Sequence, residues 1–119
     1  MTTTPVEPLP EGGPTTLGAV KFALLIEDET DDTFLEPIVA AVNGLVSELP
    51  VADKARRLGV WPFKVTQGAT MLAARLYRRR NSPEGVAAFG NEGPVYVQRN
   101  DPDVAMLLEL GAWASPQVG

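Results

Sequence analysis

The sequence predicts a small all-α protein: a bundle of three to four helices with one extended loop or short strand. Its 119 residues suit one domain with a modest hydrophobic core, and 45% of them are apolar. Apolar residues recur at helical spacing in several stretches, whereas only residues 94–99 alternate as a strand does. We expect a helical domain over 15–111 between a flexible arm, 1–14, and a tail, 112–119.

The arm and the first helix are predicted from proline, glycine and threonine positions. Residues 1–14 hold four prolines and two glycines, which favour an extended, mobile segment with no core to join. Thr15 and Thr16 offer hydroxyl groups that can cap a helix running to about Ile26.

The strongest helical pattern covers residues 32–49. Thr33 and Glu36 fit a capping box, Pro37 is expected in the first turn, and Pro50 marks the end. The apolar stripe consists of Phe34, Leu35, Ile38, Val39, Val42, Leu45, Val46 and Leu49.

The second half of the chain is predicted to contain shorter elements. Two helical turns over 52–58 are expected to end at Gly59, and a longer helix over 62–81 carries arginines in its last turns. Residues 84–93 read as an irregular, glycine-rich loop, followed by the extended segment 94–99. Asp101 and Pro102 then open a last helix that runs through Leu110 and ends at Gly111.

The residue types that are missing exclude most catalytic classes. Without cysteine or histidine, the chain cannot form disulfides, zinc–thiolate sites or the usual nucleophilic triads. The acidic run 27–32 lacks the glycine and spacing of a calcium loop, and 85–93 lacks the spacing of a phosphate-binding loop. We therefore expect no enzyme activity, no cofactor and no metal site. No apolar run is long enough to span a membrane, and no export signal is recognisable, so we expect a cytoplasmic start.

Charge is divided unevenly along the chain. Residues 1–53 hold one base and ten acids, while residues 54–119 hold nine bases and five acids. Such halves can attract each other within one chain or between copies. The arginines at 75 and 78–80 can form ion pairs, bind nucleic-acid phosphates, or simply remain solvated. The acidic net charge of −5 argues against a DNA reader.

One stretch resembles a known family. Residues 71–86 read Met-Leu-Ala-Ala-Arg-Leu-Tyr-Arg-Arg-Arg-Asn-Ser-Pro-Glu-Gly-Val, and they are followed by Phe89-Gly90, Pro94-Val95-Tyr96-Val97 and Asp101-Pro102-Asp103-Val104. This pattern resembles the head–tail connector (adaptor, or head-completion) proteins of long-tailed phages, notably those of actinobacterial hosts. The resemblance covers about 15–111, and the arm and an insertion at 51–61 depart from it.

The resemblance implies a structural virion protein without catalytic residues. Such connectors form a homo-oligomeric ring, usually dodecameric, beneath the portal vertex. The ring joins the DNA-filled head to the stopper and tail, and extends a channel through which DNA passes without sequence-specific contact. The implied partners are the chain itself, the portal protein and the stopper protein, with no membrane. The implied location is the head–tail junction of the virion, after assembly in the host cytoplasm.

Two hypotheses follow for the surfaces of such a ring. First, arginines of one subunit approach the acidic segment of the next, through Glu27, Asp28, Glu29, Asp31, Asp32, Glu36, Arg75, Arg78 and Arg79. Second, the last helix and tail dock on the portal through Val104, Leu107, Leu108, Leu110 and Trp113. The alternative function is a small nucleic-acid-binding regulator that uses the arginine-rich helix.

Overall fold

The structure, a computed structural model, describes residues 8–80 and 89–114, and within these ranges it contains helices and no strand. The all-α class is therefore confirmed, but three to four helices are too few. The helices are α1 (Leu17–Leu24), α2 (Asp32–Ser47), α3 (Pro50–Leu58), α4 (Phe63–Arg78), α6 (Pro94–Asn100), α7 (Pro102–Leu107) and a short 3-10 helix, η1 (Gly111–Trp113).

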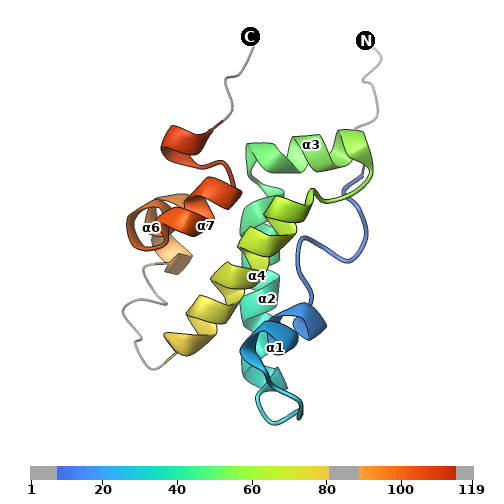
Figure 1. Cartoon of the computed structure of the whole chain (residues 1–119), viewed down its shortest axis with the longest axis vertical. Coiled ribbons are helices and arrows are strands. Elements are labelled where there is room, and N and C mark those ends of the chain that lie inside the picture. Colours follow the sequence, from blue (N-terminus) through green and yellow to red (C-terminus); the bar gives the residue numbers. More distant parts are fainter. Residues whose placement is uncertain (1–7, 81–88, 115–119) are drawn as a thin grey trace.

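Helix α4 forms the centre of the bundle. It packs against α1 and α2 on one side and against α7 on another, as Figure 1 shows. Its inward face is built from aliphatic and small side chains, among them Val65, Ala69, Leu72 and Leu76, all nearly or fully buried. Gly68 allows the closest approach, since a Cβ built there would lie 3.0 Å from Leu107 Cβ and 3.1 Å from Leu108 Cδ2.

The N-terminal segment joins the core earlier than predicted. Leu9 packs against the core and Pro14 is fully buried, so residues 8–14 differ from the free arm that we expected; residues 1–7 lie outside the described ranges. Thr16 caps α1 as predicted, because its Oγ1 accepts from the Ala19 N–H at 3.1 Å. Thr15 instead forms a hydroxyl–hydroxyl bond of 2.7 Å to Thr70.

The predicted capping box of the second helix is wrong. Helix α2 begins at Asp32, so Thr33 already lies inside its first turn, and Pro37 is in the helix interior. The N-cap residue Asp31 makes no side-chain capping bond, because its carboxylate accepts a bond from the Tyr77 hydroxyl instead.

The next two helices agree with prediction to within three residues at each end. The two turns predicted over 52–58 form α3, and Gly59 caps it with φ +73°, a conformation that favours glycine. Pro62 is the N-cap of α4 rather than its first residue, and α4 ends at Arg78.

The predicted extended segment is wrong, because residues 94–99 lie in α6. Pro94 occupies the first helical position, where its missing N–H costs nothing, and the helix buries the neighbours Tyr96 and Val97 while Val95 stays exposed. A lone strand would also lack a partner, since the described ranges contain no other. Of the predicted irregular loop 84–93, residues 84–88 lie outside the described residues, and the prediction is wrong for residues 89–92, which are helical.

The C-terminal end also differs. Helix α7 ends at Leu107, three residues before the predicted end, and Gly111 begins η1 instead of terminating α7. Residues 115–119 of the predicted tail lie outside the described residues. In the described part of the chain, no single helix is long and apolar enough to cross a membrane, and only α2 and α3 together, bent by 86°, pass that test.

Candidate functional site

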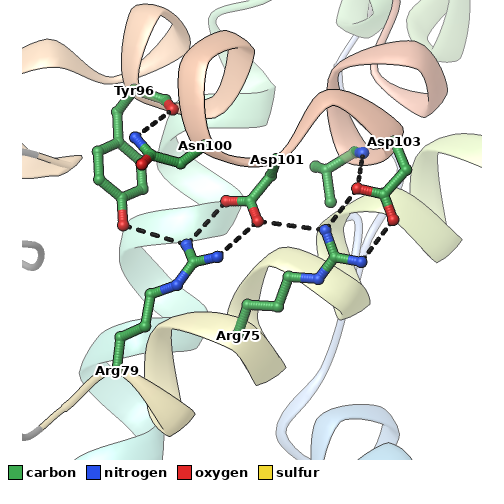
Figure 2. A network of polar contacts seen from close by, with 7 residues as sticks. Arg75, Arg79, Tyr96, Asn100, Asp101 and Asp103 are labelled. Atoms are coloured by element: carbon green, nitrogen blue, oxygen red, sulfur yellow. Dashed lines mark hydrogen bonds and ion pairs between the residues drawn. The ribbon is translucent and has the colours of Figure 1, made fainter.

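The most extensive polar cluster among the described residues lies where α4 faces the junction of α6 and α7 (Figure 2). Arg79 donates two parallel hydrogen bonds to the Asp101 carboxylate, Nη1 to Oδ2 at 2.8 Å and Nη2 to Oδ1 at 2.7 Å. Asp101 is only 1% exposed, so its charge depends on these partners. The fit of a planar guanidinium to a carboxylate fixes both distance and orientation.

Arg75, one turn earlier on α4, extends this cluster. It donates from both Nη atoms to Asp103, and its Nη1 also lies 3.2 Å from Asp101 Oδ1. The hydrogen bonds from Arg75 lower the pKa of the Asp103 carboxyl from its usual 3.8 to about 2. The hydrogen bond to Asp103 is in turn the main reason why the pKa of the Arg75 guanidinium is raised. Hydrogen bonding to Asp101 raises the pKa of the Arg79 guanidinium.

Tyr96 completes the cluster from α6. Its hydroxyl accepts from Arg79 Nη1 at 3.1 Å, and the guanidinium carbon of Arg79 lies 5.9 Å from the centre of the Tyr96 ring. Phe89 packs edge-on against the same ring, and Asn100 Nδ2 donates to the Tyr96 carbonyl. The arrangement therefore works as a clamp that holds α6 and α7 on α4, and it identifies an intrachain role for Arg75 and Arg79.

The predicted acidic segment is partly paired within the chain. Asp32 Oδ1 lies 2.8 Å from Lys21 Nζ, which raises the pKa of Lys21, and Asp31 accepts from the Tyr77 hydroxyl. The hydrogen bond to Asp31 is also the main reason why the pKa of Tyr77 is raised. The other four acids of the predicted interface are exposed: Glu27, Asp28, Glu29 and Glu36.

The last turn of α4 thus meets the acidic segment inside one chain. Tyr77 makes the direct contact, and the Arg80 guanidinium stacks 4.1 Å from the centre of its ring. Arg78 is exposed and forms no ion pair with any residue of the described ranges. Of the three interface arginines, only Arg78 therefore has an uncommitted charge, and contact with a neighbouring subunit remains a prediction.

The predicted portal-docking residues separate into two groups. Val104, Leu108 and Leu110 are buried in the chain's own core, because α7 packs its apolar face on α4. Leu107 is half-buried, and Trp113 on η1 is exposed. Docking through the first three would require α7 to leave the bundle, so the docking prediction now depends on Leu107 and Trp113.

A shallow hollow lies between residues 10–19 and residues 59–66. It is lined by apolar and hydroxyl-bearing side chains with Glu11 as its one ionisable residue, and the indole ring of Trp61 forms part of its wall. Within the described ranges, no group of three or more acidic side chains is arranged to hold a metal ion.

Sequence reasoning missed two features of these surfaces. Asp101 and Asp103 were not assigned as partners of the arginines, although acidic residues in the basic half were the available signal. Exposed apolar side chains at Phe22, Leu25 and Leu58 were not singled out either, since their exposure depends on how the helices pack. No protein-family model matches the chain, and comparisons with curated proteins and with solved structures find no match.

Proposed function

We propose that this chain is a structural subunit of a phage head–tail connector, which assembles as a ring beneath the portal vertex. The observation that carries the proposal is the clamp between α4 and the α6–α7 junction. Its members Arg75, Arg79, Tyr96, Asp101 and Asp103 all come from the stretches on which the resemblance rests. These residues are separated in sequence but meet in space. This supports the view that the resembling stretches form one structural unit, as in the connector proteins, and do not match by chance.

The helical bundle also suits a ring subunit. It exposes four carboxylates around the α1–α2 loop, and its basic half exposes Arg57 and Arg78. Heterologous contacts, which build closed rings, need two different surfaces on one subunit. In this role the chain provides faces for its own copies, for the portal and for the stopper, and no catalytic group or cofactor is needed.

The nucleic-acid alternative is less well supported by the described contacts. Two of the four clustered arginines, Arg75 and Arg79, are neutralised by Asp101 and Asp103, and Arg80 is stacked on Tyr77. A phosphate would have to displace these carboxylates, which hold the guanidinium groups in two-pronged geometry. Arg78 and Arg80, both exposed and without an ion pair to the described residues, are left for phosphates, and two such contacts give weak binding with modest salt dependence.

Electron microscopy of phage particles that contain this chain tests the proposal. We expect many symmetric copies in density directly below the portal, between the portal and the stopper. Absence of the chain from the particles, together with salt-sensitive binding of the purified chain to duplex DNA, would contradict the proposal and favour the regulator.

Binding to the portal protein provides a second test. We expect Trp113→Ala to weaken co-purification with the portal, because Trp113 is a large exposed side chain close to the C-terminus of the bundle. Val95→Ala is the control, since Val95 is also exposed but lies on α6, outside the last helix and tail that are predicted to dock. Equal binding by both variants and the unmodified chain would remove η1 from the docking surface.

A further inference from the structure

Large apolar side chains are exposed around the loop between α1 and α2, among carboxylates. Phe22 at the end of α1 and Phe34 near the start of α2 are both largely exposed. Between them the chain carries five acids in 27–32, and the one nearby lysine, Lys21, is already paired with Asp32. We call Phe22, Leu25, Phe34 and residues 27–32 the acidic end.

Leu25 is the most unusual residue of the acidic end. It closes α1 in the left-handed conformation with φ +61°, where its N–H and that of Ile26 bond back to the carbonyls of Phe22 and Lys21. Glycine is the usual residue at this position of a helix terminus, because a Cβ there is strained. Leu25 is nevertheless 87% exposed, so the isolated chain gains almost no burial from it. A leucine in this strained conformation has a reason to be there if another molecule buries its side chain.

A second group of exposed apolar side chains lies at the connection between α3 and α4. It consists of Leu58, Val60 and Phe63, of which Phe63 is 82% exposed. We call these residues, with Lys54, Arg56, Arg57 and Lys64, the basic end.

The charge of the basic end is only partly neutralised within the chain. Arg56 pairs with Asp53, whereas Lys54 and Lys64 share the single carboxylate of Glu109, with each Nζ 3.5 Å from Oε2. Arg57 is exposed and has no ion pair to the described residues. A surplus of positive charge therefore surrounds the exposed apolar side chains.

The two ends cannot meet within one chain. Figure 1, viewed with the longest axis vertical, places the α1–α2 loop at the bottom and the α3–α4 connection at the top, with the length of α4 between them. Contact therefore requires a second molecule. A second copy fits, because one end has apolar groups with negative charge and the other has apolar groups with positive charge. Two-fold pairing of like ends would place like charges together and is disfavoured.

We propose that the acidic end of one copy contacts the basic end of the next, so that Leu25 and Phe63 become buried between neighbouring copies. This inference rests on the proposed function, in which copies of the chain are neighbours, and it names the surfaces they share. It also assigns the basic side of the contact to the α3–α4 connection, since Arg75 and Arg79 already have partners. When copies repeat this contact head to tail, it is heterologous and propagates to a ring or an open helical array, whereas an antiparallel pair would stop at a dimer.

The experiment compares single substitutions by sedimentation velocity, at concentrations up to about 1 mM so that even weak association is detected. We expect the unmodified chain to form species larger than a dimer as its concentration rises. Leu25→Gly and Phe63→Ser should each weaken association by about tenfold or more, as removal of a central apolar contact does. Val95→Ser is the control, since Val95 is an exposed apolar residue on α6 outside both ends.

Leu25→Gly separates association from folding. Because glycine suits the left-handed conformation, this variant should unfold at the same or a higher urea concentration than the unmodified chain while it associates less. Loss of folding therefore cannot account for its loss of association.

Mixing the two variants tests the geometry of the contact. Leu25→Gly keeps an intact basic end and Phe63→Ser keeps an intact acidic end, so the mixture should form a one-to-one dimer that grows no further. Each variant alone should associate about tenfold more weakly than the mixture, or not at all. Association of either variant alone to the same extent as the mixture would overturn the head-to-tail contact, as would an unmodified chain that is monomeric up to about 1 mM.

These outcomes distinguish the inference from the proposed function. An unmodified chain that is monomeric in solution but appears as a ring below the portal would overturn the inference and leave the connector proposal standing. A chain that associates through both ends but is absent from the virion would support the inference and overturn the connector proposal.

Discussion

Arg79 and Asp101 form a two-pronged ion pair that joins the end of α4 to the junction of α6 and α7, across 22 residues of sequence. The carboxylate is 1% exposed and also receives a bond from Arg75. A buried charge with three donor contacts holds its neighbours in one geometry, because any other arrangement leaves that charge without compensation. The pair therefore determines where the C-terminal helices lie on the bundle.

Asp101→Asn should destabilise the fold by about 2 kcal/mol, because two partly buried guanidinium groups lose their shared carboxylate. Asp103→Asn is the matched control; the Asp103 side chain is half-exposed, so we expect a loss of about 1 kcal/mol or less. Urea unfolding followed by far-ultraviolet circular dichroism measures both. Equal losses of unfolding free energy in the two variants would mean that the burial of Asp101 does not strengthen its ion pairs with Arg75 and Arg79.

The pKa of Asp103 predicts how stability depends on acid. Because folding lowers this pKa from 3.8 to about 2, the pair with Arg75 contributes its full stability above about pH 4, and this contribution is lost as the pH falls from 4 towards 2. The urea midpoint of the unmodified chain should therefore fall more steeply over this range than that of Asp103→Asn. Parallel curves for the two proteins would contradict the assignment.

Gly68 should resist replacement by a larger residue. A valine side chain there would press on Leu107 and Leu108, and we expect a loss of about 1–3 kcal/mol as α7 is displaced from α4. Gly44→Ala on α2 is the control, because a Cβ built there meets nothing within 4 Å. That change should stabilise the protein by about 1 kcal/mol through helix propensity. Thermal unfolding of both variants checks the contrast, and a neutral Gly68→Val would show that the helices can separate without cost.

Arg78 tests the predicted contact between arginines and the acidic segment of an adjacent subunit. Reversal at Arg75 or Arg79 would damage the clamp, whereas Arg78→Glu changes an exposed side chain. If the contact exists, Arg78→Glu should reduce ring assembly on the portal, judged by negative-stain electron microscopy, without changing the free energy of unfolding. Gln67→Glu, an exposed position on the same helix, is the control. If Arg78→Glu forms normal rings, Arg78 does not contact the acidic segment of the adjacent subunit.

Local signals in the sequence were sufficient for the first four helices. The Thr16 cap, the apolar stripe of α2 and Gly59 at the end of α3 are each determined by residues close in sequence. All are observed, except that Phe34 of the predicted stripe is largely exposed. The capping box failed because α2 begins at Asp32, before Thr33, and Asp31 at the N-cap is engaged by Tyr77, 46 residues away, a contact that no local pattern contains. Local patterns predict helix existence well, but a distant partner can shift a boundary.

The C-terminal region was predicted less well for a related reason. Alternating apolar residues at 94–97 suggested a strand, but Tyr96 is held by Arg79 and by Phe89, and these contacts favour a helix that starts at Pro94. The division of charge between the two halves was visible, whereas the pairing of Arg75 and Arg79 with aspartates of their own half was not. Which carboxylate an arginine pairs with depends on how the helices pack, and composition alone does not determine that.

The left-handed leucine that closes α1 has a consequence for how this sequence can change over time. Glycine at position 25 would suit the backbone better, and the exposed leucine side chain gains almost no burial in the isolated chain. Homologous chains that keep the head-to-tail contact should therefore retain a large apolar residue at this helix terminus, despite its strain. Chains that have lost the contact should drift towards glycine or asparagine there. The identity of this one residue would then report, across a family, which members still assemble through that surface.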